Sequence, residues 1–507
     1  MKLNVNKIIK LVLFNLVIIS GAYSLEDGGG TNASIGTVNI NGEIYNQLSI
    51  KPEIPIGKLG IGLDIYFYFN ENGIYWENWD FKNSNSIYRT IVDKIYYLRW
   101  GESGDDIYIL AGALPSVTLG HGMLINNYSN LMEYPQIRQI GLNVQAKLNG
   151  FNFEFVHSNF KVSYPGIIGF RTSYSIIPQK LSVGTSFVTD LNQYAGLKDI
   201  DGDTYPDYYD LYPNDPNKHD NKDSLKNIYD TWDGDYLGQG IAGFDAWYNS
   251  QGYEDVSFSD MKKDPVSGMA FDITYNMSEN MTIFSQYAKL YGASINNEDF
   301  SNGNDSLLGW GFVPVGIKAK IGPLDVLTEY RINSRRFIFS YWDRAYDINR
   351  VSIVTDDDGD KHLLTKESQL YQFGSLKGFF MQTSLSIMEI IKLGVGYQNM
   401  VGEKWDYELK DYKLNEKNQT FLSTVSLDNS IIPKLGKADA FYQQSNIPNP
   451  FKFNPNTSTI WGYDIGIELS NTVMLLYKNR TSYIEDSEYP DSFLPIKNIQ
   501  IETQFTF

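Results

Sequence analysis

The chain ends in the stretch Ile499-Gln500-Ile501-Glu502-Thr503-Gln504-Phe505-Thr506-Phe507. Its odd-numbered positions are mainly apolar and its even-numbered positions are polar. A two-residue period places alternate side chains on opposite faces of a β-strand. The stretch therefore predicts a final strand whose apolar face is covered by something other than a following domain.

The same period recurs along the chain, in residues 58–70, 140–148, 151–155, 391–398 and 461–469. In each segment one face carries Ile, Leu, Val, Phe or Tyr, and the other carries mainly Gly and polar side chains. Asn149-Gly150 separates two of these segments and is a strong signal for a two-residue hairpin turn. Helical periodicity is scarce, so we expect an all-β fold.

The final stretch resembles the closing strand of outer-membrane β-barrel proteins of the porin-like kind. The resemblance implies a single closed antiparallel transmembrane β-barrel in the outer membrane, surrounded by lipid and lipopolysaccharide. The aromatic content agrees, because 37 Tyr, 28 Phe and 9 Trp would supply the girdles that such barrels place at both membrane interfaces. The alternative is an aromatic-rich soluble β-sandwich or β-helix.

Connection lengths alternate between short and long, as expected for short periplasmic turns and long outer loops. Nineteen strands fit between them from about residue 36 onward, but a barrel with both ends in the periplasm needs an even number. We therefore predict about 18 strands, within a range of 16–20. A hairpin at Asn41-Gly42, or a strand hidden in residues 71–88 or 335–368, would change the count.

Residues 1–24 are typical of a signal peptide, with three lysines before a short apolar core and small residues at the expected cleavage site. We expect residues 25–507 to form the barrel as one domain. The chain has no Cys, which excludes a disulfide scaffold and thiol chemistry.

Residues 191–265 form a long acidic segment with 16 Asp or Glu and 6 Lys or Arg, a net charge of −10. The whole chain carries −18, which opposes nucleic-acid binding. Within this extracellular loop, five aspartates occupy positions 1, 3, 5, 9 and 12 of a twelve-residue loop: Asp199, Asp201, Asp203, Asp207 and Asp210. This spacing suits the oxygen ligands of Ca²⁺.

The loop resembles the Asp-rich calcium repeats of thrombospondin type 3 modules over about 20 residues. It departs from the EF-hand pattern, because Gly202 stands at position 4 and Asp210 replaces the usual bidentate Glu. A weak structural Ca²⁺ site, with a dissociation constant of about 10⁻⁴–10⁻³ M, is one interpretation. A solvated acidic loop without a specific ion is the other.

Three further stretches are candidates for a role in a pore. Residues 356–360 (Asp-Asp-Asp-Gly-Asp) suit an acidic turn between two strands better than a second calcium loop. Residues 118–130 favour a packed outer loop over an inward constriction. A basic group could line a pore or pair with nearby Asp343, Asp347 or Glu329, and consists of Arg331, Arg335, Arg336, Arg344 and Arg350.

The sequence favours a porin-like channel for passive diffusion of small hydrophilic solutes or ions, leaning toward cations if the acidic loop reaches the pore mouth. The alternative is a non-conducting surface barrel whose calcium-stabilised loop serves adhesion or envelope structure. The four His lack metal-ligand spacing and no nucleophile motif is present, so we expect no enzyme activity and no catalytic residues. The transported solute and assembly into a homo-oligomer are left open.

Overall fold

The computed structural model describes the chain from residue 31 to residue 506. Its gaps are residues 41–42, 72, 80–86, 89, 92, 133, 135–137, 161–165, 198–205, 207–263, 295–305, 356–360, 389, 407, 428–431, 471–472 and 486–491. The predicted signal peptide, residues 1–24, lies outside the described residues.

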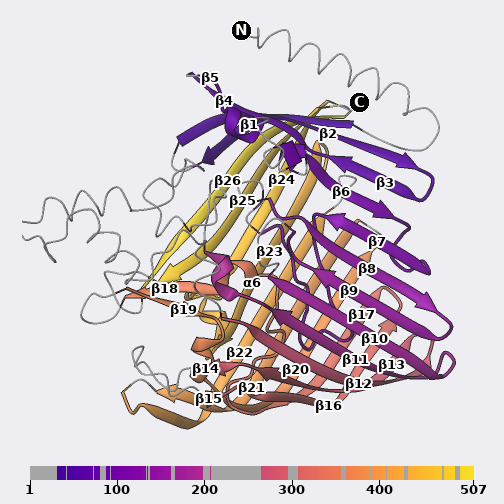
Figure 1. Cartoon of the computed structure of the whole chain (residues 1–507), viewed down its shortest axis with the longest axis vertical. Coiled ribbons are helices and arrows are strands. Elements are labelled where there is room, and N and C mark those ends of the chain that lie inside the picture. The colour runs from indigo at the N-terminus through magenta and orange to yellow at the C-terminus, as the bar shows by residue number, and fades with distance from the viewer. Residues whose placement is uncertain are drawn as a thin grey trace, which may run out of the picture.

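A ring of antiparallel strands forms the body of the molecule (Figure 1). Its strands are β1 (Thr31–Ile40), β2 (Glu43–Ile56), β3 (Leu59–Leu63) with β4 (Ile65–Asn70), β6 (Ile95–Trp100), β7 (Ile107–Gly112), β8 (Gly141–Leu148), β9 (Phe151–His157), β10 (Ile167–Ile177), β11 (Leu181–Asp190), β12 (Val266–Ser278), β13 (Met281–Tyr291), β16 (Trp310–Ile321), β17 (Leu324–Asn333), β20 (Phe373–Ile387), β21 (Ile391–Asp406), β22 (Asp411–Leu427), β23 (Leu435–Ile447), β24 (Ile460–Ser470), β25 (Val473–Glu485) and β26 (Phe493–Thr506).

The remaining elements lie in the connections. They are β5 (Gly73–Ile74), β14 (Ala293–Ser294), β15 (Ser306–Leu307), β18 (Val351–Thr355), β19 (Lys361–Thr365), the short helix α6 (Tyr346–Asn349), and the 3₁₀ turns η1 (Trp76–Trp79), η2 (Gln193–Gly196), η3 (Ser368–Gln372) and η4 (Pro450–Lys452). No helix among the described residues is long and apolar enough to cross a membrane.

The ring closes where the last strand pairs with the first. β26 lies antiparallel to β1, with Ala33 opposite Phe505 and Ile35 opposite Thr503. β3 and β4 act as one strand interrupted at Asp64, because β2 pairs with both of them. Counted in this way, the barrel has 20 strands. The all-β fold and the single closed barrel are therefore confirmed.

The expected number of about 18 strands is wrong, although 20 lies at the upper limit of the predicted range. β1 and β2 form a hairpin around residues 41–42, where the sequence also allows one continuous strand. The register pairs Val38 with Tyr45 and Ile40 with Glu43. Opposed residues across this two-residue turn have opposite parity, as in the pair Ile35 and Leu48. Apolar residues of the same parity on its two sides therefore lie on opposite faces of the hairpin, and their shared parity gave a false indication of one strand.

The alternation of short and long connections holds for most of the barrel, except that β1 is joined to β2, and β21 to β22, by short turns at the end where long connections were expected. At one end of the barrel the strands are joined by tight turns such as Asn149-Gly150, whose φ angles of 50° and 85° fit a hairpin turn of the primed type. At the other end lie the long connections, among them residues 113–140, 191–265 and 334–372. β18 and β19 pair within the last of these, as the sequence indicated for the strands around residues 356–360.

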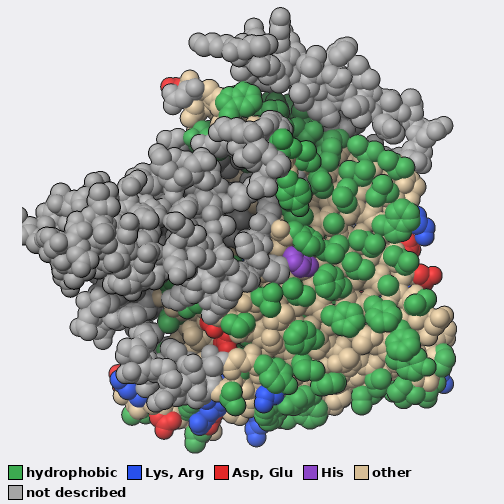
Figure 2. Space-filling model, viewed as in Figure 1, with side chains coloured by type: hydrophobic (Ala, Val, Ile, Leu, Met, Phe, Trp, Pro, Cys, Tyr) green, Lys and Arg blue, Asp and Glu red, His purple; other side chains and the backbone are tan. Residues whose placement is uncertain are grey.

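The outward face of the wall is apolar and exposed. Phe170, Phe271, Ile273, Phe379 and Ile501 each expose about half of their surface. Figure 2 shows hydrophobic side chains spread over the outer face of the barrel, with charged side chains gathered toward its edges. Lipid favours this distribution, because a charged Arg or Lys on the lipid-facing side at midplane costs about 2–4 kcal/mol.

Candidate functional site

Two of the long connections fold into the barrel and contact each other there. The first inward loop comprises residues 113–140, between β7 and β8, and the second comprises residues 334–372, between β17 and β20. Val117 pairs with Tyr128 across the first loop, and Ile125 forms a parallel bridge with Trp342 of the second loop. Residues 118–130 therefore lie inside the wall, and the expectation that they form a packed outer loop is wrong.

A hydrophobic core joins the two loops to one side of the wall. Leu124 and Trp342 lie beside Gly268 of β12, and Leu119 and Ile125 lie beside Gly169 of β10. The core also includes, among others, Leu114, Tyr128, Val156, Val188, Ala270, Ala288, Leu290, Phe337, Tyr341 and Tyr346. Burial of this apolar surface fixes the loops against β9–β16, because each apolar Å² removed from water contributes about 25 cal/mol.

A buried polar cluster ties the second loop to the end of β11. The Arg350 guanidinium lies 3.3 Å from the Asp190 carboxylate, and the Tyr346 hydroxyl donates to the same carboxylate at 2.9 Å. Tyr128 of the first loop donates to Asp347 at 2.7 Å. Burial opposes the charge on Arg350, but Asp190 and Asp347 outweigh it and raise the pKa of the guanidinium. The cluster therefore holds both loops with paired charges.

A second polar cluster fastens the end of the first loop to the break between β3 and β4. Arg138 forms an ion pair with Asp64, whose side chain also accepts hydrogen bonds from Ser49 at 2.6 Å and Tyr134 at 2.5 Å. The guanidinium carbon of Arg138 lies 3.7 Å from the centre of the Tyr66 ring. Because Asp64 is fully buried, its charge depends on this loop for neutralisation.

His121 contacts the wall at the tip of the first loop. Its ring stacks on Phe284 at 3.9 Å, and its Nε2 lies 2.7 Å from the Thr274 hydroxyl. Burial, with a contribution from Lys318, lowers the pKa of His121 to about 3. The imidazole is therefore neutral at pH 7, and its 3.9 Å approach to Asp272 is not an ion pair.

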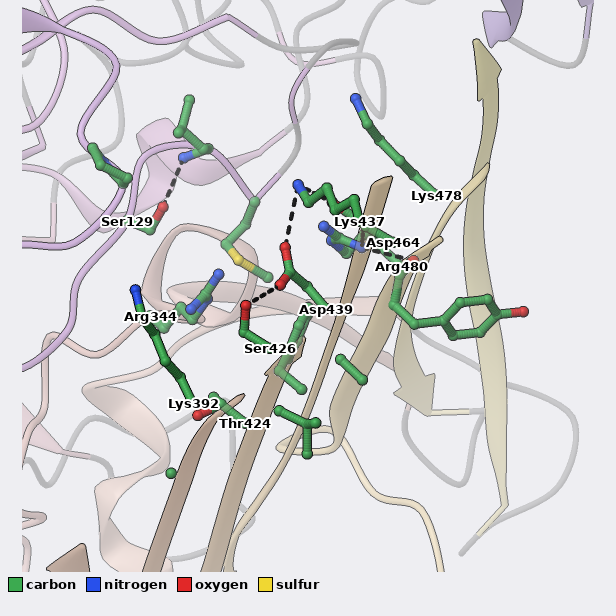
Figure 3. Close-up of a pocket in the computed structure, with 18 of the residues that line it drawn as sticks. Ser129, Arg344, Lys392, Thr424, Ser426, Lys437, Asp439, Asp464, Lys478 and Arg480 are labelled. Carbon is green, nitrogen blue, oxygen red and sulfur yellow. Dashed lines mark hydrogen bonds and ion pairs between the residues drawn. The ribbon is translucent and has the colours of Figure 1, made fainter. Parts of the chain in front are cut away.

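The loops leave a cavity of about 690 Å³ on the opposite side of the lumen (Figure 3). Its wall comes from β20–β26 with β2 and β6, and its inner side comes from loop residues such as Ser129, Met132 and Arg344. Figure 3 shows Arg344 on the loop side and Lys437, Asp439 and Arg480 on the strand side. The cavity left by the two loops is thus off-centre in the lumen.

Basic side chains outnumber acidic ones around this cavity. The lining includes six basic residues, which are Lys51, Arg344, Lys392, Lys437, Lys478 and Arg480, but only two acidic residues, Asp439 and Asp464. The register of the strands β21–β26 aligns these groups in one row across the wall, with one residue from each strand directly opposite the next. In order from β21 to β26 the row is Lys392, Ser426, Asp439, Asp464, Lys478 and Gln500.

Ion pairs neutralise only part of this positive charge. Asp464 pairs with Lys437 at 3.0 Å and with Arg480 at 2.6 Å. Lys437 also pairs with Asp439 at 3.3 Å, and Lys478 pairs with the buried Glu502. Among the described residues, Arg344 and Lys392 have no carboxylate within ion-pair distance. Arg344 lies over the Phe441 ring at 5.0 Å, and Arg480 approaches the same ring at 5.3 Å. Burial and the charge of Arg480 lower the pKa of Arg344, as expected for a cation without a counter-ion.

The structure describes only some of the candidate residues from the sequence. The calcium candidates Asp199, Asp201, Asp203, Asp207 and Asp210 lie outside the described residues, as do residues 356–360. Of the basic group, only Arg344 lines the cavity: Arg331 pairs with Glu329, Arg335 with Glu403, and Arg350 with Asp190. The wall residues Lys392, Lys437, Lys478 and Arg480 were not predicted as site residues, although the two-residue period at residues 391–398 places Lys392 on the polar face of its strand.

The fold and its surfaces define the class of the protein, a transmembrane β-barrel of the outer-membrane type: the sheet closes without an edge, its outer face is apolar and its lumen carries the polar side chains. No protein-family model and no curated protein sequence matches the chain.

Among solved structures, the chain is similar to three from Pseudomonas aeruginosa. With OccK11 (OpdR) it shares 10% identity at a TM-score of 0.30, covering 94% of this chain and 95% of that one. With the outer membrane protein opdK it shares 8% identity at a TM-score of 0.34, covering 94% of this chain and 98% of that one. With OprD it shares 8% identity at a TM-score of 0.30, covering 94% of each chain.

Proposed function

We propose that the protein is a channel for passive diffusion of small hydrophilic solutes. The observation that carries this proposal is the cavity of about 690 Å³ between the inward loops and the wall of β20–β26, lined by charged and hydroxyl side chains. A barrel of this size has room for an aqueous lumen, and loops that occupy part of it reduce the size of solute that passes.

We further propose that the cavity favours anionic solutes. Lys437, Lys478 and Arg480 are neutralised in part by Asp439, Asp464 and Glu502, and the remaining positive charge comes from lining cations such as Arg344 and Lys392. Inside low-dielectric walls, a positive field raises the local concentration of anions. The cation preference predicted from the sequence depends on residues 191–265, most of which lie outside the described residues. The described lining gives it no support.

Arg344 and Arg480 are the best candidates to contact a passing anion. Their guanidinium groups approach one aromatic ring from the loop and from the wall. Arg480 already shares Asp464 with Lys437, whereas Arg344 has no carboxylate partner among the described residues. A solute oxyanion between them would supply the missing counter-charge, and its exchange with water would remain fast because the contact is solvent-accessible.

Planar-bilayer recording of the refolded protein tests this proposal. Channel currents, with a reversal potential in a KCl gradient that indicates Cl⁻ preference, are the expected result. Currents with K⁺ preference would retain the channel and reject the anion preference. A correctly folded but silent barrel would favour the alternative of a non-conducting surface barrel.

Calcium binding by the acidic loop remains a proposal that rests on the spacing of its aspartates. Isothermal titration of the full-length protein with CaCl₂ should give heat that disappears when Asp199, Asp201, Asp203, Asp207 and Asp210 are replaced by Asn. Equal heats from the two proteins would reject the site. Contacts with lipopolysaccharide and assembly into a homo-oligomer are likewise proposals, and crosslinking in native membranes tests the second.

A further inference from the structure

The connection between β23 and β24, residues 448–459, folds back over the outside of the barrel. Phe451 contacts Tyr397 of β21 at 5.6 Å and Phe421 of β22 at 5.4 Å between ring centres. Phe453 contacts Tyr442 of β23 at 5.6 Å. These three wall residues face outward, because their neighbours along each strand, such as Gln398 and Phe441, contact Arg331 and Arg344 within the lumen.

The polar groups beneath this connection are bonded to one another. Gln444, fully buried, donates to Thr459 at 3.0 Å and to the carbonyl of Asn454. Ser458 exchanges hydrogen bonds with the backbone of Ser445, at 3.0 and 2.7 Å. A connection that satisfies these groups internally can lie against the non-aqueous part of a membrane, where unsatisfied backbone groups are costly.

Two phenylalanines project from this connection on either side of a lysine. Phe451 exposes 53% of its surface and Phe453 exposes 59%, and Lys452 between them is exposed. Among the described residues, Lys452 forms no ion pair. Aromatic rings with an adjacent cation match the boundary between acyl chains and phosphate headgroups.

The backbone at Phe453 indicates that its side chain is needed. Its φ of 54° and ψ of 26° lie in the left-handed region, which favours glycine or asparagine over a bulky residue. The turn itself is closed by the N–H of Phe453, which donates to the carbonyl of Pro450 at 3.2 Å, a bond that any residue except proline could make. A phenylalanine here therefore strains the backbone and leaves its ring exposed.

The surrounding wall continues the same surface. Trp461 and Tyr463 of β24 stack at 6.3 Å, Tyr463 stacks on Tyr477 of β25 at 5.8 Å, and the Trp461 indole lies 3.3 Å from the Tyr483 hydroxyl. This is an aromatic band on the outer face, of the kind found at a membrane interface. Two exposed rings are too small a surface for a stable dimer, which buries about 800 Å² on each partner.

We propose that residues 450–453 form a lipid anchor, in which Phe451 and Phe453 insert among the outer-leaflet acyl chains and Lys452 binds a lipid phosphate. The anchor would fix the height and tilt of β21–β25 in the membrane. This inference requires that the barrel crosses a membrane, but it does not depend on what passes through the lumen.

Site-specific fluorescence tests the anchor, because the chain has no Cys and each introduced cysteine is unique. F451C carries an environment-sensitive label, and L409C, in the exposed turn between β21 and β22, is the matched control. The full-length proteins are reconstituted in phosphatidylcholine vesicles whose acyl chains are brominated near the headgroup.

Lipid-bound bromine should quench most of the fluorescence of the label at position 451, and aqueous iodide should quench little of it. The label at position 409 should be quenched by iodide and not by bromine. Equal iodide quenching at both positions would overturn the proposal. Energy transfer between labels on different chains would also overturn the proposal if it disappears when the protein is diluted in lipid. Such a result would show that a second copy of the protein covers the site.

Two further variants separate the anchor from a merely structural role. F453G relieves the backbone strain, so it should fold at least as well while the label at 451 becomes more accessible to iodide. Phosphatidic acid in the vesicles should shift the emission of the label to shorter wavelength, and K452Q should abolish that shift. Unchanged responses in both variants would reject the roles of Phe453 and Lys452.

Discussion

Ile125 of the first inward loop and Trp342 of the second form a parallel β-bridge inside the barrel, and both side chains are 0% exposed. Neither loop could bury its apolar residues alone, because each supplies part of the surface that covers the other. The two loops therefore act as one packed unit, and the shape of the cavity depends on that unit staying in place.

Truncation of the bridge residue Trp342 should loosen this unit. W342A removes a fully buried indole from the core, and such changes reduce the free energy of unfolding by about 3–5 kcal/mol. We expect a lower midpoint in denaturant and larger, noisier channel currents, because both loops lose their shared core. F271A, on the outer face, is the control and should leave the currents unchanged. Identical currents in W342A and the native protein would show that the loops do not limit conduction.

Loss of Arg350 should release the second loop from β11. R350M leaves the Asp190 carboxylate buried without its cation, at a cost of about 3–5 kcal/mol in the free energy of unfolding. Proteolysis between residues 334 and 372 should accelerate. The double variant D190N/R350M removes both members of the ion pair and should recover part of the stability, because the buried Asp347 still loses its neighbouring cation. If the double variant is as unstable as the sum of the single variants, the ion pair does not couple the loop to the wall.

The strands could be predicted from the sequence because their signal is local. The two-residue period at residues 461–469 gives β24 within one residue at each end, the period at residues 391–398 gives the start of β21 but not its end at Asp406, and the terminal stretch indicates β26. The strand count was wrong at residues 31–56, where the main apolar residues share one parity on both sides of a two-residue turn, as they would in one long strand. There the period alone does not distinguish one long strand from a hairpin.

The inward loops could not be predicted, because their positions depend on contacts between distant parts of the chain. Tyr128 and Asp347 are 219 residues apart and meet in one hydrogen bond. The mixture of Gly, Asn and apolar residues at 118–130 favoured a packed outer loop, because no local signal in it indicates the inward contacts. The wall cations are different: the period already assigns Lys392 to a polar face, but only the register across β21–β25 brings it and Arg480 around one cavity.

Protonation of His121 should open the tip of the first loop at low pH. Burial lowers the pKa of His121 from 6.5 to about 3, so an opened loop binds the proton more readily than the closed one. Between pH 6.5 and 3, each unit of acidification should favour opening by about tenfold, and stability from this residue is fully present above pH 6.5. Protease cleavage within residues 113–140 as a function of pH measures this. H121F keeps the stacking on Phe284 and should remove the dependence; an unchanged pH profile in H121F would assign it to another group.

Neutralisation of Arg344 and Arg480 should reduce the proposed anion preference by different amounts. R344Q removes a cation that has no carboxylate partner among the described residues, so the local anion concentration should fall by roughly two- to fivefold in low salt. R480Q should have a larger effect, because it also leaves Asp464 with Lys437 as its remaining described partner. Reversal potentials in a KCl gradient report both changes, and high salt should reduce them through screening.

R335Q is the matched control, since Arg335 is exposed and pairs with Glu403 away from the cavity lining. If R344Q and R480Q shift the reversal potential no more than R335Q does, ions do not pass along the wall of β20–β26.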